Sequence, residues 1–228
     1  IQGIDRWCLW LEDLDPADLG KSSLLKDRVE ACRVFREAQP KGGDAYKYRS
    51  IPHLFRPNAS RPTVSYLCLP GVVSENRPFF TVERLGADVI ASNAAFTAAD
   101  PDGFAFAVAS SSMFMVWQRS IGGRLKSDLR FSSTVVWNNF PLPPVTDDLR
   151  EEIIVKSQEI LGVRAQFPEK SLADLYNPLA IKPSLLKAHS ELDVIVDKAF
   201  GAKKRLDSSE ERQTVLFESF VRLMNPED

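Results

Sequence analysis

The chain has 228 residues, of which 44% are hydrophobic and 26% charged, and its formal net charge is −2. This length and composition suit a globular protein with one large domain or two small ones, and no apolar run reaches the ~20 residues that a membrane-spanning helix needs. Three widely spaced cysteines (Cys8, Cys32 and Cys68) and two histidines form neither a disulfide framework nor a zinc-ligand pattern, so we expect reduced, structural cysteines and a cytoplasmic protein.

The sequence begins at Ile1 without Met or a signal-peptide pattern, so we expect a fragment of a longer polypeptide. Its positive charge is segregated. Residues 21–61 carry ten Lys or Arg against four Asp or Glu, whereas residues 146–228 carry twelve against sixteen. For nucleic-acid binding, the distribution of charge matters more than its sum.

The first part of the chain predicts a strand and then a helix. Residues 7–11 (Trp-Cys-Leu-Trp-Leu) form a short apolar run typical of a buried strand. Asp15 is suited to cap a helix that begins at Pro16, and helical apolar spacing continues to about Ala38. A polar connection rich in Pro, Gly and Tyr then extends over residues 40–62.

Strand-like segments dominate the middle of the chain, interrupted by one apolar helix. The helix is predicted over residues 104–121 and ends at Gly122-Gly123. The predicted strands span residues 64–69, 79–85, 89–96 and 130–137.

After Pro144 the pattern becomes entirely helical. Helices are predicted from residue 146, over residues 171–176, from Pro183 and from Ser208, which fits a capping box with Glu211. We therefore expect an α+β fold. Residues 1–144 would form a domain with a mixed or antiparallel sheet, and residues 145–228 an all-α helical domain.

Three groups of residues are candidates for DNA binding. On the polar connection, cations alternate with aromatic residues, and cations position a protein on DNA by neutralising phosphates. The alternative is an ordinary solvated loop. The candidates in this block are Lys41, Lys47, Arg49, His53 and Arg56.

The second group is the turn Ser74-Glu75-Asn76-Arg77. An Asn side chain can pair with adenine and a Glu carboxylate can accept from cytosine N4. The alternative is a β-turn whose polar residues serve local hydrogen bonds.

The third group surrounds the Gly-Gly helix end. Arg can bond guanine O6 and N7, or a phosphate, with two hydrogen bonds. A cation can instead cap the negative end of the helix, and we expect at least one of this group to do so and two or more to face DNA. The members are Arg119, Arg124, Lys126, Ser127 and Arg130.

Several motifs, in order along nearly the whole chain, carry a resemblance to a known family. They resemble the target recognition domain and the helical C-terminal domain of MmeI-like type II restriction-modification enzymes, which are fused adenine-N6 DNA methyltransferases and endonucleases. Leu54 and Asn76 depart from the family pattern, since basic residues are common at both positions. The motifs are residues 6–11, 28–36, 50–55, 74–79, 109–117, 123–143, 164–168, 172–178 and 187–193.

The resemblance implies a module that recognises a short double-stranded DNA sequence within a bacterial restriction-modification enzyme. Its partners would be DNA and a catalytic methyltransferase domain of the same polypeptide. That domain would bind S-adenosylmethionine and act on an adenine flipped from the stack. The fragment itself would hold no catalytic residue, metal or cofactor. Two other hypotheses are a protein-interaction scaffold and a complete small enzyme, the latter disfavoured because no nucleophile, base or metal set converges.

The remaining polar motifs favour structural roles. The segment 122–127 ends in Lys-Ser but lacks the spacing of a phosphate-binding loop. Residues 138–141 lack the adjacent prolines of the motif that holds the target base in adenine-N6 methyltransferases, so we expect an Asn side chain to tie down a turn there. For His189 we expect hydrogen bonding in the core or between helices, or a local pair with Asp193. Ser110 to Ser112 are expected to be small packing residues.

Overall fold

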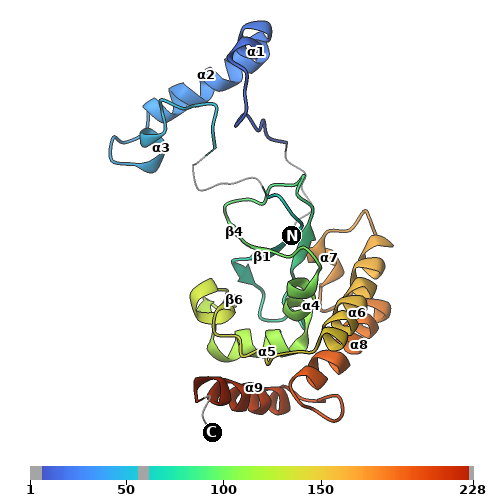
Figure 1. The fold of residues 1–228 in the computed structure, drawn as a ribbon. Coiled ribbons are helices and arrows are strands. Elements are labelled where there is room, and N and C mark those ends of the chain that lie inside the picture. The colour runs from blue at the N-terminus through green and yellow to red at the C-terminus, as the bar shows by residue number, and fades with distance from the viewer. Residues whose placement is uncertain (1–6, 56–61, 226–228) are drawn as a thin grey trace. The chain divides into compact units, whose positions relative to one another are not determined.

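The computed structural model describes residues 7–55 and 62–225, and these two stretches belong to separate compact units. Figure 1 labels helices and strands of each unit. The division between them does not coincide with the predicted boundary at residues 144 and 145, which falls inside the second unit. The assignment of residues 1–144 and 145–228 to two domains stays a prediction.

The first unit is helical. It contains α1 (Pro16–Lys21), α2 (Ser23–Glu37) and α3 (Asp44–Lys47). The predicted cap is confirmed, because Asp15 Oδ1 accepts the Ala17 N–H at 2.8 Å. The predicted single helix is two helices, because Ser22 leaves the helical conformation and caps α2.

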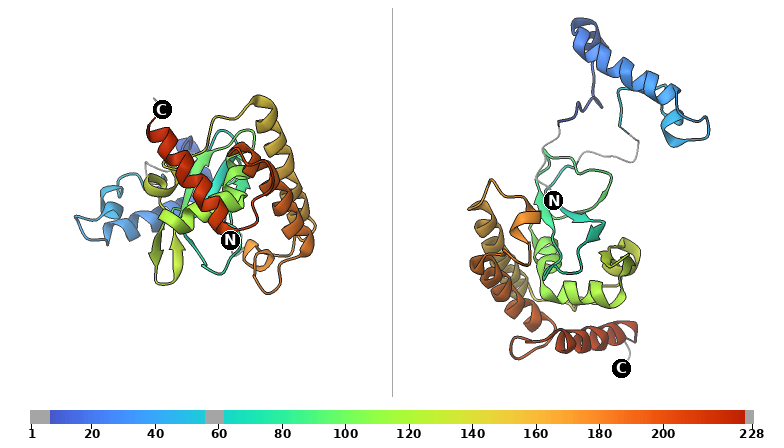
Figure 2. Two further views of the ribbon diagram at one scale, coloured as in Figure 1. Left: turned by 90° about the horizontal axis from the view of Figure 1, so that it is seen from below. Right: turned by 180° about the vertical axis from the view of Figure 1, so that it is seen from behind.

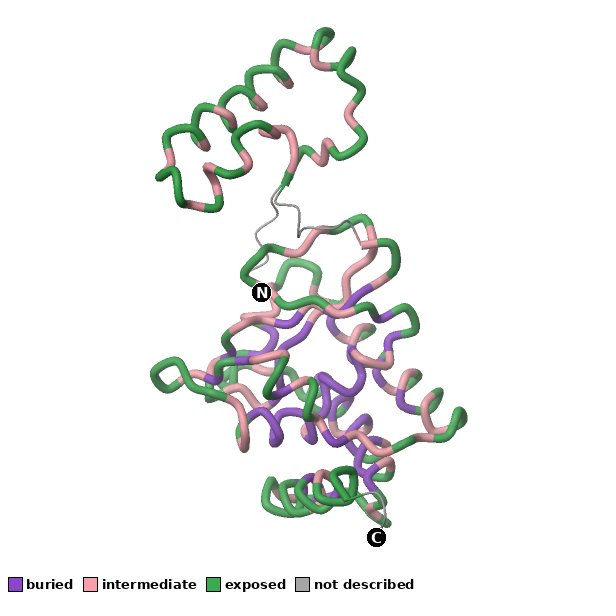
Figure 3. The backbone as a smooth tube through the Cα atoms, turned by 60° about the vertical axis from the view of Figure 1, so that its left-hand side comes forward, coloured by how far each residue is buried: buried purple, intermediate pink, exposed green. Residues whose placement is uncertain are grey.

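The predicted buried strand at residues 7–11 is wrong. This segment is irregular, and the Trp7 side chain is 97% exposed. Trp10 stacks on Phe55 with 5.1 Å between ring centroids, so the segment packs on aromatic side chains rather than in a sheet. No described residue of this unit is buried, as the absence of purple there shows (Figure 3). A unit this small has too few residues to enclose a core.

Arg36 organises the end of the first unit. Its Nη1 donates to the carbonyls of Tyr48 and Ile51 at 2.9 and 2.8 Å, and its Nη2 donates to the carbonyl of Leu54 at 2.7 Å. One of the ten cations of residues 21–61 therefore has a structural role.

The second unit contains two small antiparallel sheets. In one, β1 (Tyr66–Pro70) lies between β3 (Glu83–Leu85) and β4 (Ala95–Ala99). In the other, β6 (Asp128–Arg130) lies between β2 (Val72–Val73) and β5 (Gly123–Leu125). With the helices that follow, this confirms the predicted α+β class.

Three strand predictions are wrong over most of their length. Residues 79–82 are all buried in the core, but they do not pair with another strand. Only Glu83–Leu85 form a paired strand. Residues 89–94 are irregular, and strand β4 begins at Ala95. After β6 the chain forms a five-residue π-helix, Ser133–Trp137, because the Ser132 hydroxyl caps it by accepting the Val135 N–H.

The helices of this unit are α4 (Phe104–Ser110), α5 (Ser112–Ile121), α6 (Asp147–Ala165), α7 (Leu172–Leu175), α8 (Pro183–Ala199) and α9 (Ser209–Met224). The apolar run predicted as one helix is two, because extended Ser111 separates α4 from α5 and caps α5. The predicted start after Thr146 and the capping box of Ser208 with Glu211 are both confirmed.

One hydrophobic core joins residues on both sides of position 144. The buried Trp117 of α5 contacts Phe217 and Phe220 of α9, with 5.9 and 5.8 Å between ring centroids. The Ser112 N–H and hydroxyl both donate to the Asp193 carboxylate, at 2.7 and 2.6 Å. The helical part is thus packed on the part with sheets (Figure 2).

A buried chain of hydrogen bonds crosses this core. Arg164 donates through Nη1 to the Val82 carbonyl at 2.9 Å and through Nε and Nη2 to the Tyr176 hydroxyl at 3.0 and 2.6 Å. His189 Nδ1 lies 3.0 Å from the Ser110 carbonyl, which can only accept, so Nδ1 carries the proton. His189 Nε2 therefore accepts from the Tyr176 hydroxyl at 2.7 Å. This confirms interhelical hydrogen bonding, and the alternative pair with Asp193 is not formed.

The titration of His189 gives a prediction for stability against pH. Burial, together with nearby Arg164, lowers the pKa of His189 to about 3. In the unfolded chain the pKa of His189 is near 6.5, so the unfolded state binds the proton more readily than the folded state does. The free energy of unfolding that His189 contributes above pH 6.5 is therefore lost as pH falls from 6.5 toward 3. Between pH 7 and pH 5 this amounts to about 2 kcal/mol.

The comparison is between wild type and His189→Gln, with urea unfolding followed at each pH. Burial raises the pKa of Asp193 to about 6, so that group adds stability at low pH which is lost as pH rises through 6. Because Asp193 is present in both proteins, its contribution cancels. We expect the stability difference between the two proteins to shrink on acidification, and a constant difference would contradict a neutral, buried His189.

Candidate nucleic-acid interface

Two of the predicted groups lie on one surface of the second unit. The turn Ser74–Arg77 directly follows β2, and the third group belongs to the end of α5 and the β5–β6 hairpin. Because β6 pairs with both β2 and β5, the second sheet brings the turn beside the hairpin. In the left view of Figure 2, the hairpin appears as two yellow-green arrows extending from the body of the unit.

Glu75 is the centre of the contacts between the turn and the hairpin. Its N–H donates to Asp128 Oδ1 at 3.4 Å, and its carbonyl accepts from Arg119 Nη2 at 3.2 Å. Its Oε2 lies 3.3 Å from Arg124 Nη1 in an ion pair whose side chains are both partly exposed. Three residues that are distant from Glu75 in the sequence therefore hold this exposed turn residue.

Arg119 bonds the turn rather than its own helix. Its Nη2 also donates to the Arg77 carbonyl at 2.9 Å, so two carbonyls of the turn share one guanidinium. Among the described contacts, no cation of the third group bonds a carbonyl of the last turn of α5. The expectation that at least one of these cations caps α5 is therefore not met by a hydrogen bond among the described residues.

The hairpin tip consists of Lys126 and Ser127, which are both exposed. Lys126 has a φ of 57°, in the left-handed region that tight turns use. Arg124 Nη1 donates to the Ser127 carbonyl at 2.9 Å, so the Arg124 side chain of β5 holds the hairpin tip.

Three cations of this surface are unengaged. The side chains of Arg77, Lys126 and Arg130 form no hydrogen bond or ion pair with any residue that the structure describes. Arg130 alternates along β6 with the buried Leu129 and so projects from the opposite face. Partial burial lowers the pKa of Arg77, and a guanidinium still remains protonated at neutral pH.

The polar members of the turn are also available. Asn76 is exposed and Ser74 half-buried, and neither side chain bonds another residue in the described ranges. Asp128 is a member of the surface that sequence reasoning missed. Asp128 was missed because a single carboxylate changes the net charge of a basic cluster little. Its position two residues after Lys126 was the signal that could have identified it.

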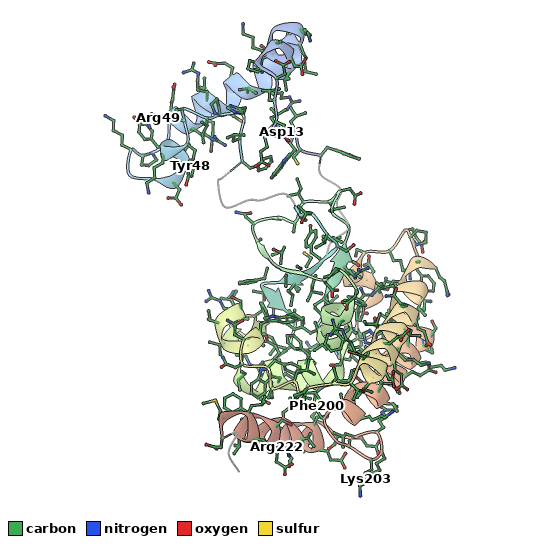
Figure 4. All side chains as sticks on the ribbon, viewed as in Figure 1. Asp13, Tyr48, Arg49, Phe200, Lys203 and Arg222 are labelled. Carbon is green, nitrogen blue, oxygen red and sulfur yellow. The ribbon has the colours of Figure 1, made fainter. Side chains whose placement is uncertain are left out.

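The first predicted group belongs to the first unit. Lys47 pairs with Asp44 at 3.3 Å. Arg49, which is labelled in Figure 4, lies over the Tyr46 ring and donates to the Tyr46 carbonyl at 3.0 Å. Lys41 is exposed, and Arg56 lies outside the described residues. His53 lines a mainly apolar groove of about 640 Å³, together with residues such as Leu54 and Phe55.

The remaining motifs have structural roles. Asn139 Nδ2 donates to the carbonyls of Thr134 and Val135 at 2.8 and 3.0 Å, which confirms that an Asn ties down this turn. Ser110 and Ser111 are buried in the core, as expected of packing residues, although Ser111 also caps α5. Ser112 differs from the expectation because it is only partly buried and bonds Asp193. Within residues 7–55 and 62–225, no cluster of three or more His, Cys, Asp or Glu could hold a metal ion. No helix there is long and apolar enough to span a membrane.

Fold and surface together define an α+β protein that presents a basic β-hairpin beside a polar turn. Family comparison then identifies the chain more closely. The model of the MmeI target recognition domain matches residues 1–144, and that of the MmeI C-terminal domain matches residues 145–226. The chain therefore belongs to the MmeI family.

Two relatives support this assignment. DNA methyltransferase A of Bacillus subtilis (strain 168) is 33% identical over 224 residues, which make up 98% of this chain and 25% of the relative. A solved structure of the type IIL restriction-modification enzyme MmeI in complex with DNA matches with a TM-score of 0.85 and 32% identity, over 96% of this chain and 29% of that one. The chain thus spans roughly a quarter of the length of each.

The unengaged cations should be dispensable for folding. Lys126→Ala and Arg130→Ala remove exposed side chains that bond no residue within 7–55 and 62–225, so each should change the free energy of unfolding by less than about 0.5 kcal/mol. Leu129→Ala in the same hairpin removes a fully buried side chain and should cost about 2–5 kcal/mol. Urea unfolding of the three variants measures this. Comparable losses in all three would show that Lys126 and Arg130 have structural partners.

Proposed function

We propose that this chain is the module that recognises a specific double-stranded DNA sequence within a larger adenine-N6 DNA methyltransferase or restriction-modification enzyme. The observation that carries the proposal is the convergence of the Ser74–Arg77 turn and the β5–β6 hairpin on one exposed surface with unengaged cations. Membership of the MmeI family supports it, because the solved member is described in complex with DNA.

The shape and chemistry of the surface suit the major groove of DNA. That groove admits a two-stranded β-ribbon, which is the form of β5 and β6. Arg77, Lys126 and Arg130 would neutralise phosphates, whereas Asn76 and Ser127 offer uncharged hydrogen-bonding groups. The proposed roles differ accordingly, since phosphate contacts position the protein and contacts to base edges select the sequence.

We further propose that catalysis lies in a part of the parent protein outside this chain. The Bacillus relative is named a DNA methyltransferase, and this chain matches 25% of it. The catalytic domain would bind S-adenosylmethionine and would be a partner of this chain within the same polypeptide. Residues 1–228 would then supply the DNA sequence preference, and the parent enzyme would act in the cytoplasm.

Fluorescence anisotropy of the 228-residue chain with a labelled random-sequence duplex tests the proposal across a salt series. We expect log K to fall linearly with log salt, with a slope of about 0.9 for each phosphate contacted. Lys126→Ala and Arg130→Ala should each reduce the slope by about 0.9 if each side chain contacts one phosphate.

Lys203→Ala is the matched control. It removes an exposed cation on the loop between α8 and α9 (Figure 4), and it should leave the slope unchanged. Absence of salt-dependent binding, both by this chain and by the full-length parent, would contradict DNA recognition and favour the scaffold hypothesis. Equal effects of all three substitutions would indicate non-specific attraction instead of this surface.

A further inference from the structure

The cations of the hairpin surface fall into two classes. We infer that Arg119 and Arg124, together with Glu75, are positioning residues that hold the turn and the hairpin in one fixed arrangement. Contact with DNA then falls to Arg77, Lys126 and Arg130. The assignment of DNA contact to Arg77, Lys126 and Arg130 rests on the proposed function, whereas the positioning role of Arg119, Arg124 and Glu75 concerns the free protein.

Glu75 is held at three of its polar groups. Its N–H, its carbonyl and its Oε2 are each bonded by a different residue: Asp128, Arg119 and Arg124. These partners lie 53, 44 and 49 positions away along the chain. A turn needs no such contacts for its own hydrogen bonds, since the Arg77 N–H already donates to the Ser74 carbonyl at 3.1 Å. The contacts therefore fix where the turn lies, beside the hairpin.

Arg119 would have to give up its present bonds to contact a phosphate through Nη2. That atom donates to the carbonyls of Glu75 and Arg77, and both bonds join α5 to the turn. A guanidinium presents its donors in a rigid plane, which suits two acceptors at fixed positions. A Lys ammonium keeps the charge but lacks this geometry. Arg119→Lys therefore tests whether the charge of Arg119 or its two hydrogen bonds to the turn matter.

Arg124 connects the turn to the hairpin tip. Its Nη1 bonds both Glu75 Oε2 and the Ser127 carbonyl, at 3.3 and 2.9 Å. Because Arg124 pairs with the buried Leu129, its side chain starts on the opposite face of the sheet from Arg130. An exposed ion pair of this kind adds little to global stability. Its effect is to restrict the tip that carries Lys126.

The first arm of the experiment needs no DNA. Amide hydrogen exchange of residues 123–130 is measured in the 228-residue wild type and in Arg119→Lys, Arg124→Lys and Glu75→Gln. We expect several-fold faster exchange in each of these variants. The matched controls Lys126→Arg and Arg130→Lys should exchange at the wild-type rate. Thermal unfolding checks that each variant is folded, and Glu75→Gln is the second test if an Arg variant fails to fold.

The second arm uses anisotropy with the random-sequence duplex. If Arg119 is a positioning residue, Arg119→Ala and Arg119→Lys should weaken affinity to the same extent without changing the salt slope, because no phosphate contact is lost. If Arg119 contacts phosphate, the Ala variant should lower the slope by about 0.9 and the Lys variant should behave as wild type.

Unchanged exchange in all three variants, or the phosphate pattern for Arg119, would overturn the inference. Failure of the wild type to bind DNA would count against the proposed function alone, since the exchange arm tests positioning in the free protein.

Discussion

The buried guanidinium of Arg164 is the constraint on which the second unit depends. It is 7% exposed, and its charge lies 3.7 Å from Glu83 Oε1, so hydrogen bonds must satisfy most of its donors. The Val82 carbonyl and the Tyr176 hydroxyl do this, and Tyr176 in turn donates to a neutral His189. A buried cation with all these partners specifies one arrangement of helices α6 to α8 around the segment that contains Val82, because any other would leave polar groups unpaired.

This constraint reaches the candidate interface through a short stretch of chain. The Phe79 ring stacks on His189 with 3.8 Å between centroids, and the Val82 carbonyl accepts a hydrogen bond from Arg164. Residues of the buried chain of hydrogen bonds therefore hold both ends of the segment 79–82. The Ser74–Arg77 turn is separated from this segment only by Pro78 and is held on its other side by Arg119. Because the core and the hairpin both hold this surface in place, it loses little conformational entropy on binding. Such pre-organisation favours recognition of a specific partner.

Three local capping signals predicted helix starts correctly, two others (Ser22 and Ser111) were missed inside apolar runs, and signals that depend on tertiary partners failed. Asp15, Thr146 and Ser208 predicted helix starts correctly, because a cap needs only the next few residues. The β-branched run after Ser132 predicted a strand, but capping by that serine and burial of Val136 produced a π-helix. For the site, polar and charged residues marked the turn and the segment after the Gly-Gly helix end as candidates, but the sequence patterns did not predict that this segment forms the β5–β6 hairpin. That Arg119 and Arg124 face the turn, and that Asp128 joins them, depends on the pairing of β6 with β2, which sequence patterns did not reveal.

The most direct test of the proposed interface is photo-cross-linking of the 228-residue chain to a duplex that carries bromodeoxyuridine, followed by mass spectrometry of the linked peptides. The proposal predicts cross-links in peptides that contain residues 74–77 and 123–130. Cross-links confined to other peptides, such as those of α9, would contradict the assignment of DNA binding to the turn and hairpin.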